Sequence, residues 1–132
     1  MDMIVDFPGG DRVDAQYGSF TIMTDQRPSD GGEGSAPTPF TLFLASLATC
    51  AGIYVLGFCK KRKLPTDGIR LIQRVQRDPE NRMVKKVELV IQVPSDFPEK
   101  YHSSLVRSAE LCAVKKHLQN PPAFEIHTQV VE

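Results

Sequence analysis

The chain has 132 residues, 41% of them hydrophobic and 24% charged, which is enough for one soluble domain with one hydrophobic core. Its 16 basic residues balance its 16 acidic residues, so no global field favours nucleic acid or an anionic membrane. We therefore predict a single domain over residues 1–132 that binds neither nucleic acid nor membrane.

The first 24 residues predict short β-strands joined by tight turns. Gly9 and Gly10 in PGGD supply the first turn, and Gly18 marks a second bend. The start, MDMIVDFPGG, has early aspartates and no basic region before a long apolar run, so it does not resemble a signal peptide. Residues 25–39, DQRPSDGGEGSAPTP, predict a loop that is long for a compact domain, and such loops are often functional.

A long helix is predicted from Pro39 to about Lys63. Thr38 is a plausible N-cap and Pro39 suits the first helical position. Apolar residues surround the helix nearly completely from Leu42 to Phe58, which predicts a helix buried centrally or wrapped by a partner subunit. A membrane span is the weaker alternative, because the run contains Ser, Thr and Gly residues and no second span exists.

The second half of the chain predicts a hairpin, then helices, then a strand. Residues 67–78 and 83–93 alternate between apolar and polar residues around a turn at 78–82. Helical spacing follows over residues 98–119, with a possible break near Ser103 or Ser108, and residues 123–132 predict a closing strand. The fold class is therefore α+β.

The three cysteines are an odd number in a chain without an export signal, which favours free thiols in a reducing compartment such as the cytoplasm. No Cys-x-x-Cys motif is present and no histidine lies within four residues of Cys50 or Cys59, so we expect no metal and no cofactor. Cys59 points away from Cys50 on the helix, and we interpret it as a small buried hydrophobe.

Cys50 and Cys112 each allow two interpretations. Cys50 shares one side of the helix with Phe43, Leu47 and Tyr54, and it is either another buried hydrophobe or a thiol delivered to a site. Cys112 is followed by two lysines three and four residues later, which either favour its thiolate or form the solvated side of a helix.

Two segments favour the functional interpretation of both cysteines: GSAPTPFTLFLASLATCAGIYVLGFCKKRKLP and, downstream, AELCAVKKHLQNPPAFEI. They resemble the OsmC/organic hydroperoxide resistance (Ohr) family over most of the chain. The resemblance includes the Pro-x-x-Leu-Phe helix entry, the small-residue stretch that ends in Cys50, the strand hairpin between the two cysteines, and the second cysteine in its own helical context. It implies an intertwined α+β homodimer in which two long central helices are backed by sheets.

The resemblance also implies a function. Characterised members of that family reduce organic hydroperoxides with two cysteines, so Cys50 would be the peroxidatic thiolate and Cys112 the resolving thiol. An external dithiol would recycle the disulfide. An arginine from the first hairpin assists in that family, and Arg12 matches its region, whereas Arg27 in the long loop is the alternative. The apolar side of the helix with Phe43, Leu47 and Tyr54, together with Arg27 and Glu33, would bind the substrate.

The sequence differs from the family pattern where a carboxylate commonly holds that arginine. Those positions are Phe40 and Thr41 here, and Glu33 in the loop is the candidate substitute. Two other classes of function stay open: a ligand-binding or sulfur-handling protein without peroxidase activity, and a structural dimeric domain with inert cysteines.

Overall fold

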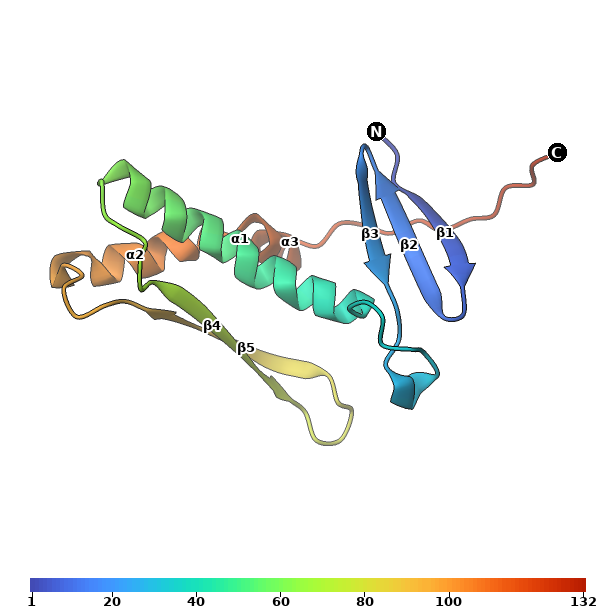
Figure 1. The fold of residues 1–132 in the computed structure, drawn as a ribbon, viewed down its shortest axis with the longest axis horizontal. Coiled ribbons are helices and arrows are strands. Elements are labelled where there is room, and N and C mark those ends of the chain that lie inside the picture. Colours follow the sequence, from blue (N-terminus) through green and yellow to red (C-terminus); the bar gives the residue numbers. More distant parts are fainter. The chain divides into compact units, whose positions relative to one another are not determined.

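The strands and helices of the computed structural model, which describes residues 1–132, fall into two units, residues 1–46 and 47–132. The first unit holds β1 (Ile4–Gly9), β2 (Arg12–Tyr17) and β3 (Phe20–Thr24), a 3-10 turn η1 (Pro28–Asp30) and the start of α1 (Pro39–Lys61). The second holds the rest of α1, β4 (Arg70–Arg77), β5 (Val84–Gln92), η2 (Glu99–Tyr101), α2 (His102–Ala109) and α3 (Ala113–Gln119) (Figure 1). The predicted α+β class is confirmed.

The first unit is an antiparallel meander in the order β1-β2-β3. Gly10 and Gly18 adopt φ angles of 56° and 58° in the two turns, a region that glycine enters without steric cost. Many apolar side chains of this sheet are exposed to solvent: Ile4, Val5, Phe7, Phe20, Ile22 and Met23. These side chains are largely uncovered within the single chain.

The long loop after β3 is organised around the buried carboxylate of Asp25. That carboxylate accepts hydrogen bonds from the hydroxyl and backbone N–H of Ser35 and from the backbone N–H of Gln26. The bonds from Ser35 are the main cause that lowers the pKa of Asp25 to about 2. Because the folded-state pKa is depressed, this carboxylate stabilises the loop at neutral pH and loses that effect only as the pH falls toward 2.

The long helix α1 begins and ends close to its predicted bounds. The Thr38 hydroxyl accepts from the backbone N–H of Thr41, which confirms Thr38 as the N-cap. At the other end Lys63 adopts a left-handed φ of 55°, and the N–H of Leu64 donates to the carbonyl of Cys59, as in a Schellman motif. By length and composition alone α1 could cross a membrane, which is weak evidence in a helix that also supplies core residues.

The core of the second unit lies between α1, α2 and the β4–β5 hairpin. Its buried members are Ala51, Val55, Phe58, Cys59, Phe97, Leu105 and Ala109. Apolar residues of the hairpin pack against this cluster, including Leu71, Leu89 and Ile91. The predicted hairpin is confirmed, because β4 pairs antiparallel with β5 from Arg70↔Gln92 to Arg77↔Val84.

Replacing Leu105 by alanine is expected to destabilise this core strongly. Leu105 is 2% exposed, whereas its neighbour Val106 is 50% exposed. A buried leucine truncated to alanine loses transfer free energy and leaves a cavity, so the free energy of unfolding should fall by about 2–5 kcal/mol. Urea unfolding followed by circular dichroism measures the change. Val106→Ala is the control and should cost about 1 kcal/mol or less; equal losses would contradict the assigned core.

Two predicted features need correction or refinement. The predicted single or broken helix over 98–119 is η2, α2 and α3, with the break at residues 110–112, close to the expected Ser108. The predicted closing strand is wrong for the single chain, because residues 123–132 form no strand. A strand needs a neighbour for its N–H and C=O groups, and the alternating pattern of this segment meets none within its own chain.

Candidate functional site

Two cysteines that are 62 positions apart in sequence meet beside the first turn of α3. Cys50 lies midway along α1 and is half-buried, and Cys112 is the N-cap residue of α3 and is 2% exposed. The side chain of Cys112 lies close enough to Cys50 to help lower the pKa of its thiol, and neither cysteine is in a disulfide. The structure therefore brings together the two thiols that the sequence singled out.

The surroundings of Cys50 favour its thiolate. The backbone N–H of Val114 is the first cause that lowers the pKa of the Cys50 thiol, followed by the side chain of Cys112 and the backbone N–H of Ala113. Burial opposes this shift and is outweighed. Cys50 lies midway along α1, so neither end of its own helix reaches it, and its position alone predicts that a cation from another segment must supply the stabilisation. The backbone N–H groups of Ala113 and Val114, in the first turn of α3, also lower the pKa of the thiol, so a cation is not the sole source of stabilisation.

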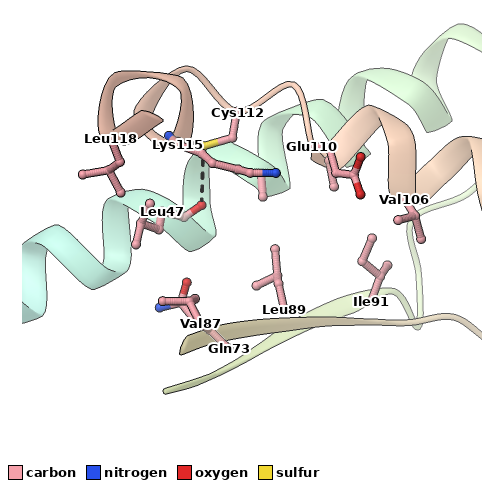
Figure 2. A pocket seen from close by; sticks show the side chains of 12 residues that line it. Leu47, Gln73, Val87, Leu89, Ile91, Val106, Glu110, Cys112, Lys115 and Leu118 are labelled. Carbon is pink, nitrogen blue, oxygen red and sulfur yellow. Dashed lines mark hydrogen bonds between the residues drawn. The ribbon is translucent and has the colours of Figure 1, made fainter. Parts of the chain in front are cut away.

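Cys112 is held by backbone groups rather than by the lysine ammonium groups that follow it. Its sulfur accepts from the backbone N–H of Lys115 at 3.4 Å and contacts the Leu47 carbonyl oxygen at 3.9 Å. The contact with the Leu47 carbonyl holds Cys112 against α1 (Figure 2), while the bond from Lys115 makes it the N-cap of α3. The helix therefore places one sulfur and two backbone donors next to Cys50.

An apolar cavity of about 440 Å³ opens on Cys112. Side chains of Val87, Leu89 and Ile91 on β5 face it from one side, and those of α1, α2 and α3 from the other (Figure 2). Three polar side chains also line it: Gln73, Glu110 and Lys115. A mostly apolar cavity with a few polar groups is typical of a site for a small organic ligand.

The predicted substrate-binding residues of the helix do not share one cavity. Leu47 lines the apolar cavity beside Cys112, whereas Tyr54 lines a second cavity between α1 and α2. Phe43 belongs to the first unit, where its ring lies 5.4 Å from the ring of Phe40. Of these three residues, Leu47 alone contacts the cysteine pair within the second unit.

The predicted polar partners all belong to the first unit. Arg12 donates from Nε to the Gly9 carbonyl at 3.3 Å. Arg27 forms an exposed ion pair with Asp30 at 2.8 Å. The backbone N–H of Glu33 is among the donors to the Asp25 carboxylate, so Glu33 belongs to the ordered loop. The functional roles of Arg12, Arg27 and Glu33 stay predictions.

Cys59 has the environment expected of a buried hydrophobe. It is fully buried in the core, and burial raises the pKa of its thiol, against the smaller opposing effect of the Arg62 charge. No three His, Cys, Asp or Glu side chains gather in a geometry that could hold a metal ion.

Sequence reasoning missed the backbone donors of Ala113 and Val114. The signal for them is weak but present: a cysteine directly before AVKKHLQ stands where an N-cap residue stands, and the first N–H groups of a helix have no partner within it. The sequence does not indicate which thiol these N–H groups would contact, because that depends on packing between segments that are far apart in the chain.

Iodoacetamide is expected to alkylate Cys50 at pH 7 faster than an unstructured cysteine peptide of ordinary thiol pKa, about 8.5. Since the folded-state pKa of Cys50 is lowered, its thiolate stabilises the fold above that ordinary pKa, and the effect is lost as the pH falls through the folded-state value. Mass spectrometry of each cysteine across pH 5–9 measures the profile. Cys59 is the internal control and should stay unlabelled in the native protein; a Cys50 midpoint at or above that of the peptide would contradict the site.

Comparison with known proteins agrees with this architecture. The sequence model of the OsmC-like protein family matches residues 32–127. The fold is similar to a putative osmotic stress induced and detoxification response protein from Psychrobacter arcticus, with a TM-score of 0.72, 22% identity, and coverage of 86% of this chain and 85% of that one.

The fold is also similar to the organic hydroperoxide resistance protein OsmC from Legionella pneumophila. That match has a TM-score of 0.53 and 20% identity, and covers 90% of each chain. An OsmC-like protein from Mycoplasma pneumoniae matches with a TM-score of 0.65 and 13% identity, over 91% of this chain and 86% of that one. A search of curated proteins finds no match. The family match spans well over half of the sequence and includes both cysteines, so the chain belongs to the OsmC-like family.

Proposed function

We propose that this protein is a thiol-dependent peroxidase that reduces organic hydroperoxides through Cys50 and Cys112. The observation that carries the proposal is the contact between the two side chains, in which Cys50 has a lowered pKa and Cys112 lies beside an apolar cavity. A reactive thiolate next to a second thiol is the arrangement that forms a disulfide through a sulfenic acid. The Psychrobacter arcticus protein is named for osmotic stress and detoxification and the Legionella pneumophila protein for organic hydroperoxide resistance, and both names agree with this role.

The proposed reaction proceeds in three balanced steps. The Cys50 thiolate attacks the distal oxygen of ROOH, the O–O bond breaks, and the alkoxide takes up a proton and leaves as ROH. The Cys112 thiol then attacks the Cys50 sulfenic acid, and water leaves as the disulfide forms. An external dithiol supplies two electrons by thiol–disulfide exchange, which restores both thiols and leaves the reductant as a disulfide.

The N–H groups of Ala113 and Val114 have a direct part in this proposal, because they stabilise the thiolate without a neighbouring cation. Arg12 is the proposed residue that orients the peroxide, since a guanidinium keeps its charge and can form two hydrogen bonds at once. Arg27, which is already paired with Asp30, is the alternative, and Glu33 is the proposed carboxylate that would hold the arginine.

A thiol count after addition of one equivalent of cumene hydroperoxide tests the proposal. The reduced protein should lose two thiols per chain within the mixing time and retain Cys59, and tryptic mapping should find a Cys50–Cys112 disulfide. Cys59→Ser is the matched control and should react as the wild type does. No loss of thiols, or loss of one only, would reject the two-cysteine peroxidase.

One observation favours a second candidate, a ligand-binding or sulfur-handling protein. The apolar cavity is lined by Cys112 but not by Cys50, so a ligand held there would meet the less exposed thiol. In that case an organic electrophile should modify Cys112 alone and leave no disulfide. The same thiol count and mapping experiment separates this candidate from the peroxidase.

We also propose that the protein acts as a homodimer in the cytoplasm. The exposed apolar side chains of β1 and β3, of Ile53 on α1 and of residues 123–132 are numerous for a monomer of this size. A second copy is the proposed cover for these surfaces, in keeping with the prediction from the all-round apolar helix. The reducing environment of the cytoplasm suits three free thiols.

A further inference from the structure

A second, more open cavity of about 620 Å³ lies between α1 and α2, and the proposed peroxidase chemistry does not use it. Three basic side chains line it: Lys61, Arg62 and Arg107. No acidic residue is among its lining residues, and none of the three basic groups forms an ion pair. The basic cavity, as we call this site, therefore presents uncompensated positive charge in a protein of zero net charge.

The guanidinium groups are held in place by other contacts. Arg62 lies 3.6 Å above the ring of Phe58 and donates to the Phe58 carbonyl at 3.3 Å. Arg107 donates to the Ser104 hydroxyl at 3.2 Å, one turn earlier on the same helix, α2. Such contacts reduce the side-chain entropy that would be lost on binding a ligand, so these donors are preorganised.

The remaining lining is apolar or carries hydroxyl groups. Leu111 is exposed there, and Tyr54 adds an aromatic side chain. Ser108 also lines the cavity, and its hydroxyl lies 3.1 Å from the Tyr54 carbonyl. A site of this composition pairs guanidinium and ammonium donors for an anionic head with apolar surface for a body.

We propose that the basic cavity binds a small organic anion that has an apolar body and a carboxylate or phosphate head. Arg62, directly after the end of α1, and Arg107 on α2 would contact the head, and Lys61 would add charge at the rim. The first cavity is unsuited to such a ligand, because Glu110 and Lys115 both line it and its charges cancel. The two cavities therefore suit ligands of different charge.

Isothermal titration with 1-naphthyl phosphate, 1-naphthoate and the neutral 1-naphthalenemethanol tests this proposal. Both anions should bind more tightly than the neutral compound, and their relative affinities distinguish a phosphate site from a carboxylate site. Arg62→Gln and Arg107→Gln should each weaken anion binding by about tenfold, as expected for loss of one charge-assisted hydrogen bond. The matched control is Lys86→Gln on β5, which removes one charge outside the lining residues and should leave binding unchanged.

The result is independent of the thiol chemistry. Cys50→Ser should bind the anions as the wild type does, so a failed peroxidase test leaves this site standing and the reverse is also true. Two outcomes would overturn the proposal: equal affinity for the anions and the neutral compound, or equal loss of affinity in Lys86→Gln and Arg107→Gln. Circular dichroism of each variant establishes that a loss of binding does not reflect unfolding.

Discussion

Cys50→Ser is expected to reduce hydroperoxide consumption to the background rate. A serine hydroxyl cannot form a nucleophile comparable to a thiolate at neutral pH, and no other thiol has the same donors, because the N–H groups of Val114 and Ala113 lie against Cys50. Peroxide consumption with dithiothreitol as the reductant measures the effect. The substitution should leave the fold intact, because Cys50 is only half-buried and serine is similar in shape.

Cys112→Ser is the informative companion variant. It keeps the proposed peroxidatic thiol but removes the proposed resolving partner, so one equivalent of peroxide should yield a Cys50 sulfenic acid that dimedone traps. The wild type should yield the disulfide and little trapped product. If Cys112→Ser consumed no peroxide in a single turnover while Cys50→Ser did, the roles of the two thiols would be reversed.

Local features of the sequence were sufficient to predict most secondary structure. Thr38 and Pro39 mark the start of α1, because helix capping depends on residues that are neighbours in sequence. The alternation of apolar and polar residues marks the buried face of β5, and it is also a local pattern. The left-handed residue that ends α1 is Lys63 rather than the usual glycine, and it is the residue near which the helix was predicted to end.

The stabilisation of Cys50 could not be predicted in the same way. It depends on the packing of α3 against the middle of α1, a contact between segments 62 positions apart, which no local pattern specifies. Leu47 and Tyr54 line two different cavities, and this too could not be predicted from local sequence. The position of α2 decides which side of α1 each cavity occupies. Residues 123–132 show the converse case: their pattern is that of a strand, but strand formation needs a partner.

Deleting residues 123–132 is expected to convert a dimer into a monomer. Phe124, Ile126 and Val130 alternate along this segment and are 85%, 94% and 92% exposed, and such a row of apolar side chains is stable in water only when another surface covers it. Since the chain offers no strand to pair with it, we expect the partner's sheet to supply one. Light scattering at micromolar concentration should report a dimer for residues 1–132 and a monomer for residues 1–122.

Point variants separate the role of this segment from a general effect of truncation. If residues 123–132 pair as a strand, Ile126 and Val130 share one face and His127 lies on the other. Full burial of such a side chain contributes about 1.5–3 kcal/mol, so Ile126→Asp combined with Val130→Asp should raise the dimer dissociation constant by roughly a hundredfold or more. His127→Asp adds a carboxylate to the opposite face and should change it by about tenfold at most. A monomeric wild type would contradict the intertwined homodimer, whereas a double variant that stays dimeric would place the interface on the exposed faces of β1, β3 and α1 instead.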